Sequence, residues 1–408
     1  MKSILVIGGG LVGAASALRL QAAGVRVALI DPGDVRRGAS YGNAGHIGAE
    51  QVAPWSTWSN IAGAPGRMFG AGGPLDFRWR DVGMWTPWSL RFMTACTQNA
   101  RGVAALSALL RDAMGAWLRL ADAAQMQGMV RQHGHANVWM RPRNVEPALK
   151  AWARTPIGVA SYRDMAAHEL ARYEDVLTHA PVAGILFAGT GQVRDPQGAR
   201  DAILRQFKSL GGEIVEGKVT RVRGSGVAQV TIATGETRDA EGVLVAAGAW
   251  SGPLMAQLGA HAPVIGERGY SVQSLEHAWP ENLPTTIFEE RSVVLSGFTS
   301  GLRATSFLEF GSPDGGPDKR KWARLEAHLR QLGVRFAAEP DRWMGPRPTL
   351  PDYLPAIGRL KRAPHVLYAF GHAHLGLTMA PITAELVCAL ATDTPPSVDL
   401  QPFRIERF

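Results

Sequence analysis

The chain has 408 residues, 46% of them hydrophobic and 19% charged, so it exceeds the size at which a single core usually divides into two domains. Its formal net charge is +8, but lysine and arginine are scattered along the chain, which argues against a nucleic-acid-binding arm. An anionic ligand or a membrane surface would equally explain the positive charge. The only cysteines, Cys96 and Cys388, form no CxxC pattern, so neither a disulfide framework nor a thiolate metal site is expected.

The N-terminal segment predicts a βαβ unit. Residues 3–7 form a short apolar run, 11–23 carry apolar residues at helical spacing, and 25–30 form a second apolar run that ends at Asp31-Pro32-Gly33. We interpret this segment as structural rather than as a signal peptide, because its glycines would break an apolar helix. No uninterrupted apolar run reaches ~18 residues, so no membrane-spanning segment is expected.

The turn between the first strand and the helix reads Gly8-Gly9-Gly10-Leu11-Val12-Gly13 and satisfies G-x-G-x-x-G. Gly8 permits the tight turn, Gly10 lets the backbone approach a pyrophosphate, and Gly13 allows close packing of helix on strand. Asp31 ends the second strand, where a carboxylate can accept hydrogen bonds from ribose hydroxyls. The turn therefore predicts dinucleotide binding; a glycine turn used only for packing would not need Asp31.

The next segments have mixed character. Residues 38–50 form a glycine-rich loop, and residues 55–93 contain five tryptophans among glycines and prolines. For this tryptophan-rich segment two interpretations stay open: core packing under a substrate domain, or an amphipathic patch that contacts a membrane or quinone. A long helix is expected over about 99–129, followed by a short strand at 138–140.

An α/β rhythm returns towards the C-terminus. We expect a helix over 195–210, strands over 213–222, 228–233 and 243–246, and a half-exposed antiparallel sheet over 264–310. A charged amphipathic helix at 318–332 is followed by a strand at 366–370, a glycine-rich turn and a helix from about Pro381 to Ala391.

Two late features favour FAD over a nicotinamide cofactor. The buried strand in VLVAAGAW runs directly into Gly248 and Trp250, as a strand does when it returns to close on a flavin. The segment GHAHLGLT, which contains His372, Gly376, Leu377 and Thr378, again combines a turn with a helix N-terminus. Such a terminus stabilises the negative charge that a reduced flavin develops at its pyrimidine edge. An ordinary βα turn is the alternative for this second feature.

Three stretches of the chain together resemble the D-amino acid dehydrogenase group of the DAO flavoprotein family, which includes glycine and sarcosine oxidases. They are GGGLVG with Asp31, the loop SYGNAGH followed by Ala53-Pro54-Trp55, and GPRPT through GHAHLGLT. The resemblance implies an α/β fold in which a Rossmann-like FAD-binding domain is interleaved with an α+β substrate domain built on a mainly antiparallel sheet. The expected FAD-binding domain comprises residues 1–55, 193–258 and 342–408, and the substrate domain 56–192 and 259–341.

The resemblance also implies the contacts of FAD. Ser40, Asn43, Ala44 and Gly45 would line the flavin and pyrophosphate, and the backbone of Val219 would meet the adenine side. Gly376, Leu377 and Thr378 would meet the pyrimidine edge. Some relatives carry another residue in place of His46, so their substrate specificity cannot be transferred to this chain.

Arg347 is the expected anchor of a substrate carboxylate, because the family uses the arginine of a GxRP segment in this way and a guanidinium offers a bidentate fork. His46 follows the flavin loop and is a candidate to orient or deprotonate the substrate amine, since histidine titrates near working pH. The alternatives are a surface or inter-domain arginine and a histidine that only packs.

Tyr270 and Arg303 are further candidates to face the substrate, weighed against ordinary sheet positions. His372 and His374 alternate beside the second turn, and one of them is expected to pack on the flavin. Their spacing also suits a metal, but no carboxylate or cysteine cluster accompanies them in the sequence, so no metal is expected.

The sequence thus predicts FAD-dependent oxidation of a small D-amino or imino acid, D-hydroxyproline among the candidates, by hydride transfer from the α carbon to flavin N5. The alternatives are a glycine- or sarcosine-oxidase-like enzyme, a nicotinamide-dependent dehydrogenase, or a flavin-carrying subunit of a multi-chain opine, proline or hydroxyproline dehydrogenase. The expected acceptor is a membrane quinone or another carrier, and the expected location is the cytoplasm or the inner face of the cytoplasmic membrane. Peripheral membrane contact, a partner subunit and oxygen as the acceptor stay open.

Overall fold

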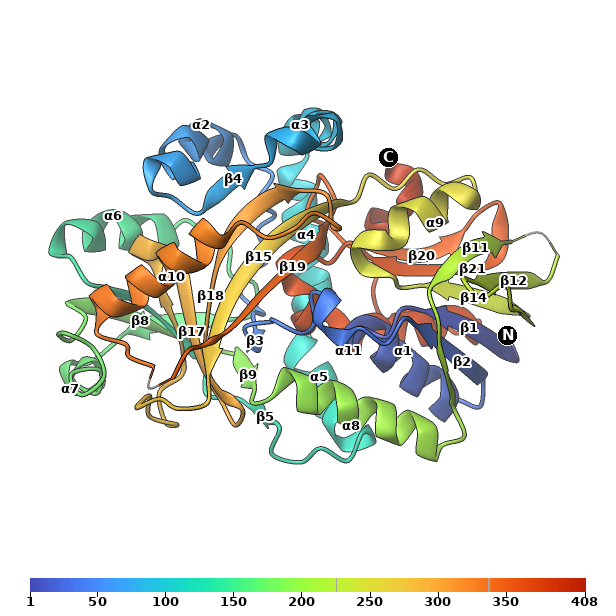
Figure 1. The fold of residues 1–408 in the computed structure, drawn as a ribbon, viewed down its shortest axis with the longest axis horizontal. Coiled ribbons are helices and arrows are strands. Elements are labelled where there is room, and N and C mark those ends of the chain that lie inside the picture. Colours follow the sequence, from blue (N-terminus) through green and yellow to red (C-terminus); the bar gives the residue numbers. More distant parts are fainter. Residues whose placement is uncertain (225, 337) are drawn as a thin grey trace.

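A computed structural model describes residues 1–224, 226–336 and 338–408. Two halves lie side by side in it, one built on a six-stranded sheet and the other on a nine-stranded sheet (Figure 1). The chain crosses between the halves several times, and both termini lie in the half with the six-stranded sheet (Figure 1). This arrangement agrees with the expected interleaved α/β fold.

The six-stranded sheet has the order β10-β2-β1-β14-β21-β20. Its first five strands are parallel, and β20 closes the edge antiparallel to β21. The strand bounds are β1 Ser3–Ile7, β2 Arg26–Asp31, β10 Glu213–Glu216, β14 Gly242–Val245, β20 Ala356–Leu360 and β21 Ala363–Phe370. The central strands β1 and β14 are apolar and almost fully buried, as parallel strands covered on both faces must be.

Helices cover one face of this sheet, and a small sheet with one helix covers the other. The first group shares a core and contains α1 (Leu11–Ala22), α5 (Ala113–Ala123), α8 (Pro196–Ser209) and α11 (Gly376–Ala391). The opposite face packs against β11 (Val219–Arg223), β12 (Ala228–Ile232), β13 (Thr237–Ala240) and α9 (Ser251–Gln257). The sheet is therefore the middle of three layers.

The C-terminal helix begins earlier than expected, at Gly376, and includes Pro381. Proline has no N–H to donate to the carbonyl four residues before it, which is that of Leu377. The indole Nε1 of Trp117 donates to this carbonyl instead, at 3.0 Å. A residue distant in sequence thus provides the hydrogen-bond donor that Pro381 cannot provide to this carbonyl.

No membrane-spanning segment was expected, because no uninterrupted apolar run is long enough; one stretch nevertheless meets the test by length and composition alone. Residues 373–391 form one helical stretch of sufficient length and hydropathy. Most of this stretch is buried, and its side chains pack against α1, α4 (Asn99–Leu110) and α5. It is the core helix of the three-layer half.

The nine-stranded sheet has the order β19-β15-β18-β17-β16-β6-β8-β7, with β4 paired to β18. Its bounds are β4 Leu75–Phe77, β6 His135–Trp139, β7 Ser161–Asp164, β8 Ala183–Ala188, β15 Ile265–Ser274, β16 Thr285–Phe288, β17 Val293–Phe298, β18 Gly301–Gly311 and β19 Asp341–Thr349. Helix α10 (Lys319–Leu332) covers one face. The strands within 264–310 are mostly buried rather than half-exposed, because α10 covers one face and the other half of the molecule lies against the opposite face.

Three local expectations need correction. The long helix over 99–129 is two helices, α4 and α5, which a turn at Arg111 and Asp112 separates. The single strand over 213–222 is also two strands, β10 and β11, in different sheets. The expected domain boundary at 342 falls inside β19, which belongs to the nine-stranded sheet.

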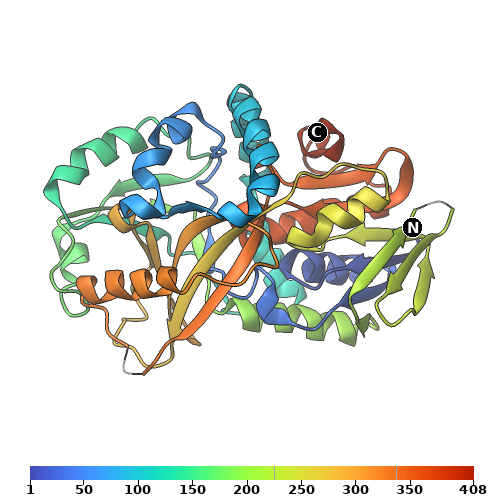
Figure 2. The same ribbon diagram turned by 45° about the horizontal axis from the view of Figure 1, so that its top comes forward.

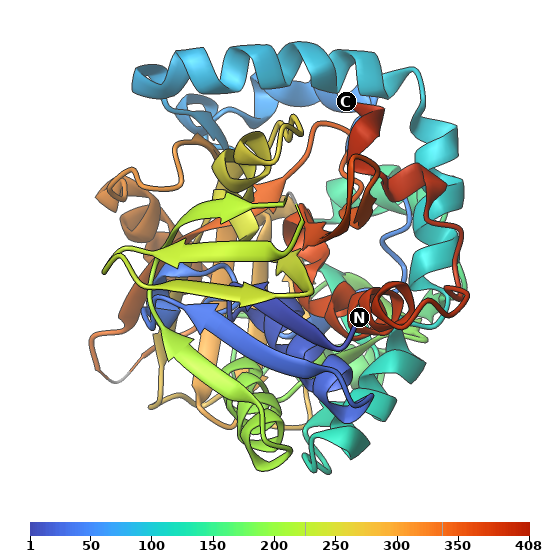
Figure 3. The same cartoon turned by 90° about the vertical axis from the view of Figure 1, so that its right-hand side faces the viewer.

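The tryptophan-rich segment forms α2 (Trp58–Arg67) and α3 (Val82–Cys96), which lie at the rim of the molecule (Figures 2 and 3). Its side chains divide into two sets. Trp88 is buried against Phe310, whereas Trp58 and Trp79 are 56% and 78% exposed. The segment therefore contributes both to the core and to an apolar surface.

A small sheet and two helices complete the framework. A small sheet of β3 (His46–Ile47), β9 (Gly191–Val193) and β5 (Val130–Arg131) joins the two halves below the cavity described next. Helices α6 (Pro142–Trp152) and α7 (Ala167–Ala171) flank the outer strands of the nine-stranded sheet (Figure 1).

Candidate active site

A cavity of about 1140 Å³ runs between the two halves. This volume lies above the upper end of ordinary small-ligand pockets, so a dinucleotide and a small substrate fit together. Predicted site residues that line it are Gly8, Gly10, Leu11, Val12, Asp31, Ser40, Asn43, Ala44, His46, Val219, Gly248, Trp250, Arg347, His372, Gly376, Leu377 and Thr378.

The glycine turn forms one end of the cavity. Gly8 has φ +104°, a conformation that favours glycine, and a side chain there would meet the carbonyl of Ala246. A Cβ at Gly13 would overlap the carbonyl oxygen of Gly8, so Gly13 is needed for α1 to pack on β1. No side chain caps α1 at Gly10 and its first turn carries no acidic residue, which leaves the N-terminus open to an anion.

Asp31 lies beside this turn at the end of β2. Its carboxylate accepts from the backbone N–H of Gly9 at 2.6 Å and from that of Gly33 at 3.0 Å. The carboxylate thus holds the glycine turn in place as well as lining the cavity. The sequence did not single out Arg200 of α8, which also lines the cavity and whose Nε donates to the carbonyl of Gly9 at 2.6 Å.

The loop after β2 forms a wall of the cavity. The Oγ of Ser40 accepts from the N–H of Leu11 at 3.0 Å, which joins this loop to the first turn of α1. Gly45 has φ +69° and does not line the cavity; its N–H donates to Oδ1 of Asn43 at 2.7 Å. Gly45 therefore shapes the loop that presents Asn43 and Ala44.

Arg303, expected to face the substrate, supports this loop from behind. It is 4% exposed and lies outside the cavity lining. Its Nη1 donates to the carbonyls of Tyr41 at 2.9 Å and Asn43 at 2.6 Å, and Gln273 accepts from its other nitrogens. Burial lowers the pKa of Arg303 to about 10, so it stays charged at neutral pH and is better described as a positioning residue.

Tyr270, also expected near the substrate, points to the opposite side of the nine-stranded sheet. Its hydroxyl donates to Oε2 of Glu309 at 2.6 Å and accepts from the N–H of Asp318 at 3.0 Å. Burial and the adjacent carboxylate raise its pKa. The ammonium of Lys321 lies in the same network, 3.0 Å from Glu309 and 2.6 Å from Asp76. This buried network ties α10 to the sheet.

The N-terminus of α11 faces the cavity from the six-stranded half. Oγ1 of Thr378 accepts from the N–H of Gly48 at 3.0 Å and donates to the carbonyl of His46 at 3.3 Å. His372 is buried with Nε2 3.1 Å from Oγ1 of Thr383, and burial lowers its pKa to about 3. The start of α11, the turn before it and the loop around His46 are therefore one hydrogen-bonded unit.

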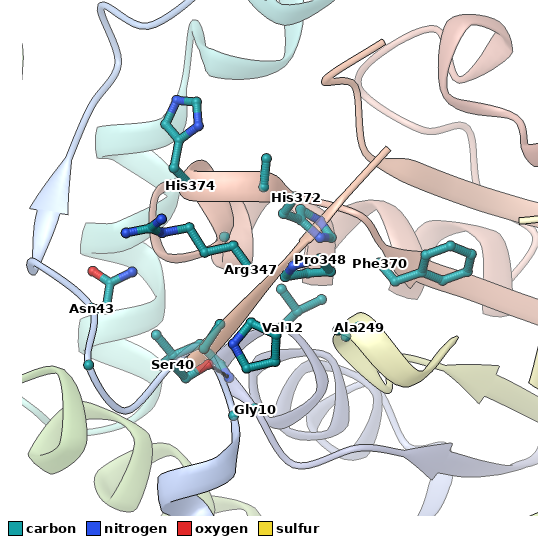
Figure 4. A pocket seen from close by; sticks show the side chains of 18 of the residues that line it. Gly10, Val12, Ser40, Asn43, Ala249, Arg347, Pro348, Phe370, His372 and His374 are labelled. Atoms are coloured by element: carbon teal, nitrogen blue, oxygen red, sulfur yellow. Dashed lines mark hydrogen bonds between the residues drawn. The ribbon is translucent and has the colours of Figure 1, made fainter. Parts of the chain in front are cut away.

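Arg347 extends from β19 into the cavity. Its Nη1 donates to the carbonyl of Phe307 at 3.1 Å and to Oε1 of Glu267 at 3.4 Å. Phe307 has φ +70° and lies where the register of β18 shifts against β15, so a β-bulge turns this carbonyl towards the arginine. Figure 4 shows the guanidinium directed towards the side of the cavity where Asn43 and His374 lie.

Glu267 is the residue that fixes Arg347, and the sequence analysis missed it. It is fully buried and lies directly opposite Arg347 in the register of β15 and β19. Tyr353 also donates to its carboxylate, at 2.9 Å. Burial raises the pKa of Glu267 against the opposing attraction of Arg347. Cross-strand pairing is not visible in the sequence, so no local signal pointed to Glu267.

His46 lies on β3 with its ring paired to a buried carboxylate. Its Nε2 is 3.1 Å from Oε1 of Glu50, and Nε2 of His135 is 3.8 Å from the same oxygen. Burial alone would raise the pKa of Glu50, but His135 and His46 outweigh burial and lower it to about 2. Burial lowers the pKa of His135 to about 3. At neutral pH Glu50 is therefore ionised and His135 is neutral.

Further residues complete the substrate end of the cavity. His374 lines it, is half-buried and, within the described residues, has no hydrogen-bond partner on either ring nitrogen; burial lowers its pKa to about 3. Trp55 packs on this ring with centroids 4.6 Å apart. Arg67 of α2 and Glu289 also line this end, and neither has a sequence motif that marks it.

Among the described residues, two groups have the composition of a metal site, although no metal was expected. His46, Glu50 and His135 place one ligand atom each within 4.8 Å of one another, and so do Asp76, Glu309 and Asp318. The ammonium of Lys321 forms ion pairs with all three members of the second group. The cation that these carboxylates bind is therefore Lys321.

These observations fit a flavin dinucleotide. The glycine turn is shaped so that side chains are excluded from it, and two helix N-termini, those of α1 and α11, point at one cavity. The cavity is lined continuously from Val219 through the turn to Thr378. The predicted cofactor residues are thus brought together, apart from Gly13 and Gly45, which shape the walls from behind.

Comparison with known proteins agrees with this geometry. The family model described as DAO, FAD dependent oxidoreductase, matches residues 3–390. A D-amino-acid oxidase of Bradyrhizobium diazoefficiens is 31% identical over 424 residues, which cover 100% of this chain and 99% of the relative. A glycine oxidase of Pseudomonas aeruginosa is 27% identical and covers 98% of both chains. The crystal structure of glycine oxidase from Geobacillus kaustophilus superimposes with a TM-score of 0.73 at 20% identity over 100% of both chains.

Proposed function

The chain belongs to the DAO family of FAD-dependent oxidoreductases, and from this membership we propose that it oxidises a D-amino or imino acid at the bond between its α carbon and its nitrogen. The observation that carries the proposal is Arg347, whose guanidinium enters the same cavity as the glycine turn and the start of α11. A substrate carboxylate held there would lie beside the cofactor site. The name of the D-amino-acid oxidase relative supports the same substrate class.

The residues that would hold FAD are those of the cavity wall. The N-terminal amides of α1 suit the pyrophosphate, with Arg200 as a nearby positive charge, and Asp31 suits the ribose. Gly376, Leu377 and Thr378 present amides at the start of α11. When bound, FAD supplies the oxidant that accepts a hydride from the substrate α carbon.

Arg347 is prepared to bind a carboxylate. In the described part of the chain only its Nη1 makes protein hydrogen bonds, so Nε and Nη2 remain available for a bidentate contact. Glu267 and the carbonyl of Phe307 restrict the guanidinium before the substrate arrives. This reduces the conformational entropy that binding must otherwise remove.

His46 is the proposed acceptor of the proton that the substrate ammonium must lose. Because Glu50 is ionised, Nε2 of His46 carries the proton and donates to it, which leaves the lone pair on Nδ1, a buried atom that has no hydrogen-bond partner among the described residues. The carboxylate also stabilises the imidazolium that forms when the ring accepts a proton. The substrate thus leaves a proton with the protein and a hydride with the oxidant, and departs as an imine. Water then hydrolyses an acyclic imine to the oxo acid.

For the electrons, we propose a membrane quinone or another carrier as the acceptor. Support comes from the exposed apolar side chains of α2, α3 and the turn before α3: Trp58, Trp79, Val82, Met84, Leu90 and Met93. Arg80 and Arg91 are exposed beside them, and the whole chain has a net charge of +8, which suits an anionic lipid surface. The protein would then work at the inner face of the cytoplasmic membrane.

The test of the function is a substrate panel on the purified FAD-loaded chain. Anaerobic bleaching of the flavin absorbance and reduction of an artificial dye are measured with D-amino acids, their L-enantiomers, glycine, sarcosine and D-hydroxyproline. We expect bleaching with D-substrates and dye reduction by the isolated chain without a partner. Bleaching only by glycine or sarcosine, or dye reduction only after a second subunit is added, would overturn the proposal.

A further inference from the structure

Glu289 is an acidic side chain at the substrate end of the cavity. It follows β16 directly and begins a short 3-10 turn, Glu289–Arg291. Three N–H groups donate to its carboxylate: the indole of Trp152 at 2.6 Å, the amide of Asn137 at 2.8 Å and the indole of Trp139 at 3.1 Å. These donors come from β6 and α6, so the tertiary fold holds this carboxylate in one orientation.

No cationic side chain of the described residues balances this carboxylate. Within the described ranges, no lysine, arginine or histidine nitrogen forms an ion pair with Glu289, whereas the fully buried Glu267 and Glu309 each have at least one arginine or lysine partner. Three neutral donors favour the ionised form, while burial raises the pKa of Glu289. A cation that arrives through the cavity would supply the missing counter-charge.

The distance between Glu289 and Arg347 suits a substrate with charged groups at both ends. In the sheet, β19 and β16 are separated by β15, β18 and β17, but Arg347 reaches across to the carbonyl of Phe307 on β18. Two to three strand spacings, roughly 10–15 Å, then remain to the carboxylate of Glu289. An extended lysine spans about 7 Å from carboxylate to terminal nitrogen, and contacts at its two ends add roughly 3 Å each.

The wall between these two groups contains apolar side chains beside the polar Ser292 and Thr305. Ile287 of β16 and Val294 of β17 are paired in register and both line the cavity. Ile287 near the end of β16 and Glu289 in the turn that follows both line the cavity. A chain of methylene groups would pack on Ile287 and Val294 before its end reaches Glu289.

We propose that Glu289 is a specificity residue that binds an ammonium or guanidinium group at the end of the substrate side chain, so that the preferred substrates are basic amino acids. This inference rests on the proposed oxidation of an amino acid anchored at Arg347. The guanidinium of Arg347 binds the α-carboxylate at one end of the substrate, and Glu289 binds the cation at the other end. Ile287 and Val294 pack on the methylene groups between them. Acidic side chains are excluded because their charge would meet that of Glu289.

The first test compares substrates on the wild-type holoenzyme. D-Lysine and D-arginine are compared with D-norleucine, which has the stem of lysine without its charge, with Nε-acetyl-D-lysine and with D-glutamate. The kcat/KM for D-lysine should exceed that for D-norleucine and for Nε-acetyl-D-lysine by at least about tenfold. If D-norleucine is oxidised as well as D-lysine, this inference fails while the proposed function stands. If no amino acid of the panel bleaches the flavin, the proposed function itself fails.

The second test uses Glu289→Gln, with Glu290→Gln as the matched control. Glu290 is adjacent but outside the cavity lining, and its carboxylate accepts from the backbone N–H of Arg141. Glu289→Gln should lower the D-lysine to D-norleucine ratio of kcat/KM by about tenfold or more, and Glu290→Gln should not change it. Equal ratios in the wild type and Glu289→Gln would overturn the assignment.

A binding measurement separates this role from catalysis and from folding. 6-Aminohexanoate has a carboxylate and a distal ammonium, and hexanoate lacks the ammonium. On the wild-type holoenzyme, 6-aminohexanoate should bind at least about tenfold more tightly, measured by perturbation of the flavin spectrum or by the shift of Tm. Similar affinities for the two ligands on the wild type would contradict the inference even if the variant does not fold.

Discussion

Glu267 and Arg347 face one another in the register of β15 and β19, with Oε1 and Nη1 3.4 Å apart. A buried carboxylate thus fixes one edge of a guanidinium whose other edge is open to the cavity. The positive charge of Arg347 is therefore partly balanced before a substrate carboxylate binds, but the orientation of its guanidinium is fixed. Glu267 weakens the attraction between Arg347 and the substrate carboxylate but orients the guanidinium. Hydride transfer from a defined carbon requires such an oriented substrate.

Replacement of Arg347 by alanine should raise KM for an amino acid substrate by roughly 30-fold or more, because it removes a charged bidentate contact. Arg347→Lys should recover only part of the loss, since an ammonium cannot form the planar fork. Steady-state dye reduction measures both variants. Arg342→Ala, an exposed arginine on the same strand, is the control. An unchanged KM in Arg347→Ala would remove the carboxylate anchor from this site.

His46→Gln should change the pH dependence of kcat/KM. In the wild type, kcat/KM should rise with pH as the proposed acceptor of the substrate proton becomes free to accept it. The variant should lack this rise and keep only the rise due to the substrate amine itself. His168→Gln, an exposed histidine, should retain the wild-type profile. Superimposable profiles for wild type and His46→Gln would leave the ring with a packing role.

Glu50→Gln should make the stability of the protein less sensitive to acid. The folded-state pKa of Glu50 is lowered from 4.5 to about 2, so its contribution to stability is present above pH 4.5 and is lost as the pH falls towards 2. Between pH 5 and 3 the Tm of the wild type should therefore fall more steeply than that of the variant. Glu281→Gln, at a side chain 84% exposed, is the control. Parallel Tm curves for wild type and Glu50→Gln would mean that the pKa of Glu50 is not lowered on folding.

Gly13→Ala should reduce FAD binding, because its Cβ would overlap the carbonyl of Gly8 and push α1 away from the turn. We expect roughly half or less of the wild-type flavin per chain, measured from the ratio of flavin to protein absorbance after purification and FAD addition. Gly83→Ala introduces a methyl group where nothing lies within 4 Å and should retain full flavin content. Full occupancy in Gly13→Ala would show that this turn tolerates a side chain.

The exposed apolar side chains of α3 and the turn before it should bind anionic vesicles. Sedimentation with vesicles containing phosphatidylglycerol should recover more wild-type protein than vesicles of phosphatidylcholine alone, and salt should weaken the binding. A double change, Trp79→Ser with Leu90→Ser, should reduce recovery at least about threefold. Leu275→Ser, an exposed leucine elsewhere, is the control. Equal recovery of the two variants would exclude this surface as the membrane contact.

The sequence by itself determined the parts that depend on neighbours along the chain. Strand, turn and helix periods identified the βαβ unit around Gly8, Gly10 and Gly13, because the tight turn and close packing need glycine at these positions. The same local reasoning found the loop before His46, the turn before Thr378 and the GxRP segment with Arg347. Helix α8 was also predicted almost to the residue, since Asp195 and Pro196 mark its start chemically.

Only the tertiary structure decided which side chains share the cavity. Tyr270 and Arg303 lie in the antiparallel sheet that was predicted over 264–310, yet one faces α10 and the other supports a loop. A strand presents alternate residues to opposite faces, and bulges shift that alternation. Glu50, Glu267 and Glu289 were recognised as site residues only from their contacts with residues of distant strands and helices. Such contacts are set by sheet order and register, which depend on the whole chain folding at once, so no local pattern in the sequence could have marked them.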